Sequence, residues 1–242
     1  MSLIVASILV LMFLNLVLGS VSIPLKSVWN IICGLGDEPV TWQNIVWKSR
    51  LPQALTALVA GAGLAISGLQ MQTVFRNPLA GPSVLGISSG ASMGVAFVVL
   101  LSGSLGGVAL SKLGVMGEIA LSIAAVIGSL SVMALIVYVS QKVKGNVTLL
   151  IIGVMIGYVA NAVIGVLKFF SVEEDIRAYV IWGLGSFSRV SGNQMMLFVA
   201  IMAILIPLSF LLIKTLNLML LGDGYARNLG LNIKRARLLV IT

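Results

Sequence analysis

The chain has 242 residues, of which 59% are hydrophobic and only 9% are charged, and its mean hydropathy is +1.14. Soluble domains carry about 25% charged residues, so this composition excludes an ordinary soluble protein and indicates a membrane protein. The net charge of +8 comes from basic residues scattered between apolar runs, as juxtamembrane charges are, and we expect no nucleic-acid partner.

The composition also limits the chemistry that the chain can perform. It contains no histidine, and Cys33 is its only cysteine. Imidazole ligands, a histidine base, an intrachain disulfide and a cysteine cluster are therefore all excluded. No Gly-Lys dipeptide occurs, so the chain cannot form a P-loop for ATP. We expect no catalytic residue, no metal site and no cofactor.

In chain order, the sequence predicts six membrane-spanning helices. Such a helix needs about 20 predominantly apolar residues. The segments that qualify are residues 3–21, 51–73, 84–103, 117–141, 147–171 and 193–215. The first lacks the basic start of a secretory signal and is interpreted as a retained helix. The predicted fold is an all-α, polytopic membrane helix bundle that forms one transmembrane domain over residues 1–242.

The basic residues predict the orientation of these spans. They divide almost evenly between the two sides of the membrane, but a cluster at 227–237 favours a cytoplasmic location for that segment. We therefore expect the N-terminus to lie in the cytoplasm.

The spans contain many small residues at spacings that allow helices to approach closely. Lipid supplies no hydrophobic force between helices, so glycines spaced by four residues favour close backbone packing. They are Gly61, Gly63 and Gly68 in the second span, Gly86, Gly90 and Gly94 in the third, and Gly153 and Gly157 in the fifth. We expect these helices to pack against one another.

A polar turn from Arg76 to Gly86 separates the second and third spans. Pro78 and Pro82 each remove a backbone donor, and Gly86 permits backbone geometry that other residues avoid. The following pattern, Gly-Ile-Ser-Ser-Gly, matches a serine-nucleophile motif at Ser88. Without histidine a packing role is favoured over an intramembrane enzyme.

Four further segments and one residue carry expectations. Acidic residues 173–175 are interpreted as a solvated loop, and residues 178–187 as a short re-entrant or surface helix, with an ordinary outer loop as the alternative. Residues 222–232 predict a turn, a short helix and a second turn, and residues 238–242 the start of a seventh span. Asn161 is a polar residue within the fifth span, either functional or an interhelical contact.

One ordered string of residues resembles a known family, the permease subunits of bacterial ABC importers for iron-siderophores, haem and cobalamin. The resemblance covers about residues 50 to 242. Its motifs are Arg50-Leu51-Pro52, Gly61 to Gly68, Phe75-Arg76-Asn77-Pro78-Leu79-Ala80, Leu85 to Ala91, Trp182 to Phe187 and Ala226 to Leu239. The signature turn is thus carried by Arg76, Asn77, Pro78, Leu79 and Gly86.

The resemblance implies a multi-pass subunit of the bacterial cytoplasmic membrane that imports a chelated-iron or cobalamin-type substrate and is not itself an enzyme. It implies a homodimer with ten helices per subunit, two cytoplasmic ATPase subunits and an extracytoplasmic substrate-binding protein. With six helices, the chain is expected to be C-terminally truncated. The alternative is a transport-inactive fragment that only associates with partners.

The resemblance also implies roles for particular residues. Arg50 would pair with an acidic residue of the binding protein, with Lys48 as a substitute for a second arginine, because Gln53 occupies that position. Asn161 would line the translocation path. ATPase coupling would involve Gly222, Asp223, Gly224, Ala226, Arg227, Leu229 and Gly230.

Overall fold

The computed structural model describes residues 2–104, 115–143, 146–187, 190 and 192–241. These residues form helices and connecting turns and contain no β-strand. Their contacts define two compact units, residues 1–65 with 186–209 and residues 66–185 with 210–242. The boundary falls within α4 (Leu51–Phe75).

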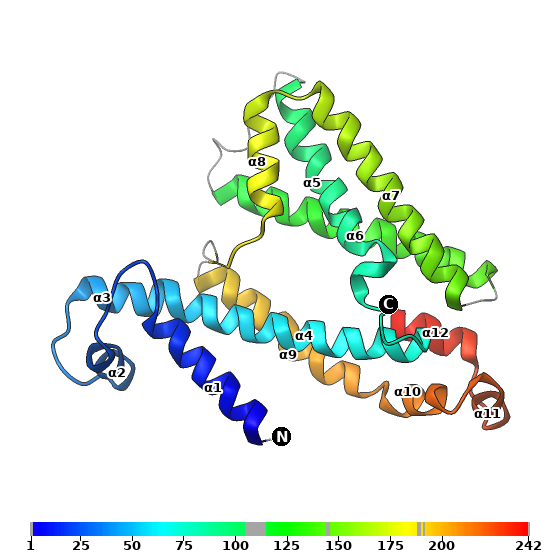
Figure 1. Cartoon of the computed structure of the whole chain (residues 1–242), viewed down its shortest axis with the longest axis horizontal. Coiled ribbons are helices and arrows are strands. Elements are labelled where there is room, and N and C mark those ends of the chain that lie inside the picture. The colour runs from blue at the N-terminus through cyan, green and yellow to red at the C-terminus, as the bar shows by residue number, and fades with distance from the viewer. Residues whose placement is uncertain (1, 105–114, 144–145, 188–189, 191, 242) are drawn as a thin grey trace. The chain divides into compact units, whose positions relative to one another are not determined.

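The first unit contains α1 (Ser2–Val17), α2 (Leu25–Cys33), α3 (Val40–Ile45) and a π-helical turn (Val46–Arg50) that leads directly into α4 (Figure 1). Pro24 and Pro39 precede α2 and α3, where a missing N–H costs no helical hydrogen bond. Gly34 ends α2 in the left-handed conformation, with φ 67°. Buried side chains of Leu16, Val28, Ile31 and Val46 form the core of this group.

The second unit is organised around α5 (Ile87–Ser104), which packs against α6 (Val115–Lys142), α7 (Asn146–Phe170) and α8 (Glu173–Gly183) (Figure 1). A short 3₁₀ turn (Pro82–Leu85) precedes α5. At the crossing of α5 and α6, a Cβ atom on residue 94 would lie 2.2 Å from the carbonyl oxygen of Ala124. Only glycine permits this approach, which confirms the close packing expected at Gly94.

The glycine expectation is only partly confirmed. Gly90 and Gly128 face one another across the same crossing, and Gly153 approaches the backbone of Leu85 where α7 passes the start of α5. By contrast, a Cβ atom at Gly61 or Gly68 on α4 would meet nothing within 4 Å among the described residues.

Four helices are long and apolar enough to cross a membrane, judged by length and composition among the described residues: Val40–Phe75, Gly117–Lys142, Val147–Phe170 and Gly192–Phe210. They coincide with four of the six predicted spans. The other two predicted spans correspond to the shorter apolar helices Ser2–Val17 and Ile87–Leu101. Much of this apolar surface is exposed, as expected where lipid is the solvent.

Three boundaries differ from the predictions. Helix α9 (Gly192–Phe210) ends before residue 215, and the apolar run continues as a separate helix, α10 (Ile213–Leu220). The run predicted to begin a span at 238–242 lies, as far as residue 241, inside α12 (Ile233–Ile241), which starts five residues earlier; residue 242 is outside the described residues. The acids at 173–175 form the first turn of α8 rather than a loop, and Asp175 is buried.

Candidate functional site

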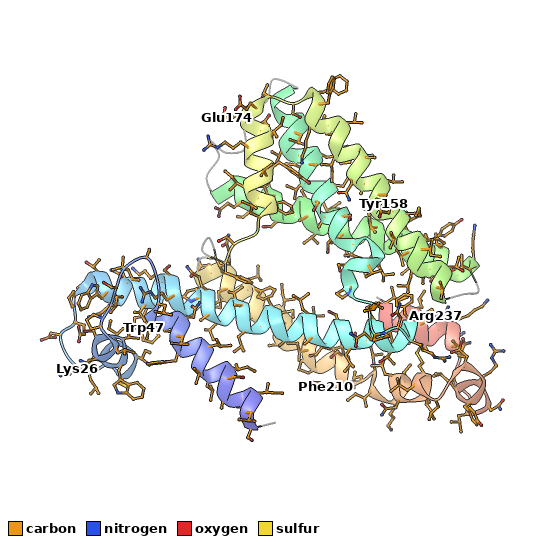
Figure 2. The ribbon with its side chains drawn as sticks, in the orientation of Figure 1. Lys26, Trp47, Tyr158, Glu174, Phe210 and Arg237 are labelled. Atoms are coloured by element: carbon orange, nitrogen blue, oxygen red, sulfur yellow. The ribbon has the colours of Figure 1, made fainter. Side chains whose placement is uncertain are left out.

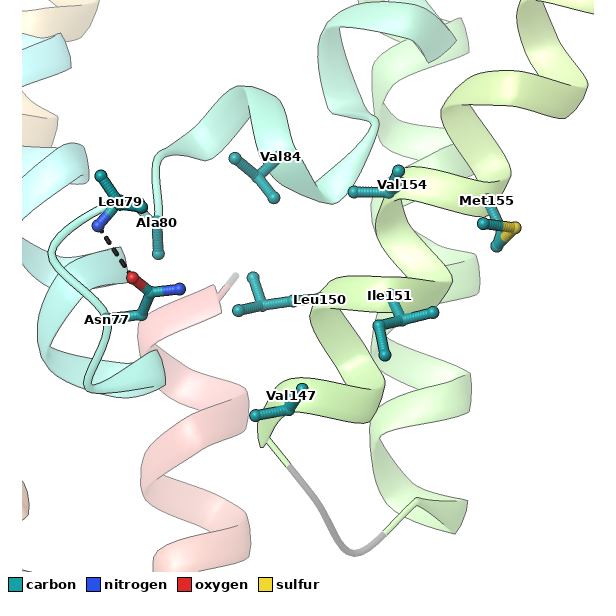
Figure 3. Close-up of a pocket in the computed structure, with 9 residues that line it drawn as sticks. All are labelled: Asn77, Leu79, Ala80, Val84, Val147, Leu150, Ile151, Val154 and Met155. Atoms are coloured by element: carbon teal, nitrogen blue, oxygen red, sulfur yellow. Dashed lines mark hydrogen bonds between the residues drawn. The ribbon is translucent and has the colours of Figure 1, made fainter.

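The signature turn has a defined backbone geometry. Arg76 follows α4 with φ 49°, and Gly86 precedes α5 with φ 76°. Between them, the side-chain Oδ1 of Asn77 accepts a hydrogen bond of 2.9 Å from the backbone N–H of Leu79 (Figure 3). Asparagine commonly stabilises a turn through this local bond. The turn therefore depends on side-chain chemistry as well as on its prolines.

A shallow, largely apolar pocket of about 390 Å³ lies between this turn and the first half of α7 (Figure 3). Its walls are formed by Leu79 and Val84 from one side and by Leu150 and Val154 from the other. Asn77 is the polar residue in its lining. Nothing in this lining resembles a catalytic or metal-binding set.

The segment 222–232 has the predicted turn, helix and turn. Gly222 has φ 105° and precedes α11 (Asp223–Asn228), and Gly230 follows it with φ 86°. The N–H of Gly230 donates to the carbonyl of Arg227 at 3.0 Å, and that of Leu231 donates to Ala226 at 2.9 Å. This pair of bonds satisfies the carbonyls at the end of a helix when the next residue is left-handed.

The first turn of the next helix is also capped by a side chain. Oδ1 of Asn232 accepts a hydrogen bond of 3.2 Å from the backbone N–H of Arg235, at the start of α12. Asparagine is among the preferred residues for this N-terminal position. The segment 222–232 is therefore a compact unit with both ends defined, in which Ala226 is fully buried.

The structure brings the signature turn and this segment together. Nη2 of Arg76 donates to the carbonyl oxygen of Met219 at 3.2 Å and forms an ion pair with Asp223. Beneath them lies one hydrophobic cluster whose buried members come from α4, the turn, α6, α7, α10 and α12. The sequence predicted that both segments lie on the same side of the membrane, but it contained no signal for this direct contact.

A second arginine lies close to this ion pair. Burial lowers the pKa of Arg237, the nearby Asp223 carboxylate opposes this shift, and Arg76 adds to it. Arg237 extends from α12 (Figure 2). Two guanidinium groups thus share one carboxylate, which makes Asp223 the only counter-charge described in this cluster.

Arg50 has an intramolecular environment that the sequence did not predict. Its side chain is 5% exposed, and Nη1 donates to the carbonyl oxygens of Leu16 and Val17, both at 2.8 Å. Nη2 donates to the carbonyl of Val21. These bonds satisfy carbonyls at the end of α1, so an acidic partner would have to compete with them. Lys48 is exposed and close in sequence.

Asn161 is exposed on α7. Tyr158, one turn earlier, is 65% exposed (Figure 2). Gly153 and Gly157 precede Asn161 at intervals of four residues along the same side of the helix and pack closely against the start of α5, so this packed stripe ends before Asn161. Asn161 therefore does not contribute to the packed core of this unit. It remains available to a water-filled path or to another helix.

Ser89, which follows the motif serine Ser88, packs between two helices. Its Oγ atom lies 3.3 Å from where a Cβ on residue 157 would sit, so it fills the space between α5 and α7 beside Gly157. Ser88 itself is exposed. No group of three or more potential metal ligands occurs among the described residues.

Lys168 packs over the ring of Tyr179, with its Nζ 4.8 Å from the ring centroid.

Comparisons with known proteins give a consistent result. Residues 7–242 match the FecCD transport family. The chain is 33% identical over 223 residues to the hemin transport system permease protein HmuU of Yersinia pestis, covering 91% of this chain and 63% of that protein. It is 36% identical over 199 residues to the vitamin B12 import system permease protein BtuC of Serratia proteamaculans, covering 82% of this chain and 56% of that protein.

A solved structure also resembles this fold. It is described as an inward-facing metal-chelate type ABC transporter, and the TM-score is 0.75 at 27% sequence identity. The similarity covers 97% of this chain and 68% of the other. The chain spans roughly three fifths of the length of the curated relatives that it matches.

Proposed function

The chain belongs to the FecCD transport family, and we propose that it is the membrane-spanning permease subunit of an ABC importer for chelated iron or a cobalamin-type compound. The family consists of transport permeases rather than enzymes. The observation that carries the proposal is the similarity to haem and vitamin B12 permeases over most of this chain. Because these relatives are named as permeases of transport and import systems, the comparisons favour a transport role over a role confined to association with partners.

We further propose that ATP hydrolysis takes place on a separate cytoplasmic subunit that binds the segment 222–232. This segment supports the role because α11 begins after Gly222 and is closed at its C-terminal end by the turn at Gly230, while Tyr225 and Leu229 are exposed. Exposed apolar side chains on a short, well-held helix suit a groove in a partner. The basic residues around it favour the cytoplasmic side.

The remaining assignments are part of the same proposal. The permease forms a homodimer in the bacterial cytoplasmic membrane, with its N-terminus in the cytoplasm and a single transmembrane domain. An extracytoplasmic binding protein delivers the substrate, and Asn161 lines the path that the substrate follows. Lys48 is exposed and suits docking of the binding protein, whereas Arg50 would first have to leave the carbonyls of α1.

Capture of the ATPase subunit tests the coupling assignment. We expect the ATPase to co-purify with the chain and to be lost when Gly224 is replaced by tryptophan. Gly224 has nothing within 4 Å of a Cβ position and no positive φ, so the large side chain projects outward without disturbing α11. Lys214→Gln on α10 is the matched control, since Lys214 is exposed and outside the segment. Undiminished capture by Gly224→Trp would overturn the assignment.

A further inference from the structure

Arg76 adopts a backbone conformation that an arginine side chain does not favour. It is the only residue other than glycine with a positive φ in the described ranges 2–104, 115–143, 146–187, 190 and 192–241. In this region the Cβ atom crowds the following carbonyl oxygen, and a glycine would remove the crowding. An arginine in such a position points to a use for its side chain, since strained residues persist where the surrounding structure holds them.

The contacts of the side chain indicate that use. Its Nη2 atom donates to the carbonyl of Met219, near the C-terminal end of α10, and pairs with Asp223, the first residue of α11. One guanidinium therefore bridges the junction between these two helices. At this junction Gly222 has φ 105°, so without the bridge the chain has a flexible point immediately before α11.

The surroundings make the bridge specific. Arg237 from α12 lies near the same carboxylate, and its buried Nε has no hydrogen-bond partner among the described residues. Asp223 pairs with Arg76, so its carboxylate connects the start of α11 to the turn that follows α4.

The bridge connects α11 to the transmembrane helices. Arg76 follows directly on α4, and the turn that it begins leads into α5. Below the ion pair, Phe75 and Met219 are both buried in the same cluster. The ion pair and this buried packing both join the start of α11 and the end of α10 to the end of α4, and packed interfaces do not deform continuously.

We propose that Arg76 is a positioning residue that fixes α11 to the α4–α5 turn, so that movement imposed on α11 by the ATPase reaches α4 and α5. The transmission of movement from the ATPase rests on the proposed function. The bridge between Arg76 and α11 is a property of this chain and can be tested without any partner.

The first measurement is the distance between α11 and the turn, by spin labels on the full chain. Labels are attached to Leu79→Cys and Tyr225→Cys in a Cys33→Ser background, since both native side chains are exposed. We expect one narrow distance distribution for the parent. Arg76→Asn removes the guanidinium but tolerates the left-handed backbone, and it should broaden the distribution.

A charge exchange separates the bridge from general damage. The double variant Arg76→Asp with Asp223→Arg keeps the net charge and restores an ion pair, so it should narrow the distribution again. Each single variant, Arg76→Asp or Asp223→Arg, should give a broader distance distribution than the parent. A distribution that stays narrow in Arg76→Asn, or that stays broad in the double variant, would overturn the bridge.

The second measurement is the number of ATP molecules hydrolysed per substrate imported, in the complex with ATPase and binding protein, with hemin and cyanocobalamin as probes. Arg76→Asn should raise this ratio by at least about fivefold, the lower end of typical coupling between sites. Lys214→Gln should leave it unchanged. An unchanged ratio in Arg76→Asn would overturn the positioning role. Failure of the parent chain to bind any ATPase would instead overturn the proposed function, and the label distances would still decide the bridge.

Discussion

Replacing Gly94 by alanine should force apart the crossing of α5 and α6. The new Cβ would lie 2.2 Å from the carbonyl oxygen of Ala124, which is 1.2 Å short of the 3.4 Å at which ordinary contact begins. It would also lie 3.1 Å from the Cα of Gly128, so backbone obstructs it and no side chain can rotate away. Overpacking of this kind costs about 1–3 kcal/mol.

The assay is reversible unfolding by SDS in mixed micelles, followed by tryptophan fluorescence. Gly165→Ala is the matched control, because Gly165 is also helical but has nothing within 4 Å of a Cβ position. It should leave the free energy of unfolding unchanged or raise it by about 0.5–1 kcal/mol, since alanine favours helix over glycine. If Gly94→Ala proves as stable as Gly165→Ala, the close crossing of α5 and α6 is wrong.

Three other predictions follow from the site. Arg50→Gln should lower the free energy of unfolding by about 1.5–3 kcal/mol, as expected for charged hydrogen bonds, whereas Lys48→Gln should not change stability in the same SDS titration. A stable Arg50→Gln variant with weakened binding-protein affinity would instead favour docking as its main role. Gly230→Ala should reduce ATPase capture, because a backbone φ of 86° costs a non-glycine residue about 1–2 kcal/mol. Gly224→Ala should retain capture, since Gly224 has no positive φ. Equal capture by the two variants would contradict this reasoning. Cys33 is exposed and is the only cysteine in the sequence. It follows the first predicted span, so with a cytoplasmic N-terminus it should react with a membrane-impermeant maleimide in intact spheroplasts. Labelling only after lysis would refute the cytoplasmic N-terminus.

Long apolar helices were the most predictable feature of this fold. Their composition alone identifies them, because the membrane requires about 20 apolar residues and leaves few alternatives. The break between α9 and α10 was not predictable in this way. Residues on both sides of Leu211 and Leu212 are apolar, so hydropathy continues unchanged through the place where the helix ends.

Local turn chemistry was partly predictable. The glycines at 222 and 230 and the prolines of the signature turn marked the ends of elements, and the structure has turns there. The early start of α12 was missed because its first turns contain Lys234, Arg235 and Arg237, which hide an amphipathic helix from a search for apolar runs.

Contacts between distant parts of the chain could not be predicted from one sequence. Arg76 and Asp223 are separated by 147 positions, and nothing local to either residue identifies the other. The same holds for Arg50 and the carbonyls at the end of α1. A basic side chain in a membrane protein is expected to have a hydrogen-bond or ion-pair partner. A backbone carbonyl of the same chain and an acidic residue of another protein can each fill that role, so the sequence does not distinguish them.

ATP-dependent uptake is the most direct test of the central claim. The chain is reconstituted into liposomes with the ATPase subunit and loaded binding protein, and labelled hemin, cyanocobalamin and a ferric siderophore are offered in parallel. We predict accumulation of one of them that requires ATP on the side of the ATPase and disappears with Gly224→Trp. Binding of the ATPase and hydrolysis of ATP without uptake of any of the three chelates would contradict the assignment of this chain as the importer's permease.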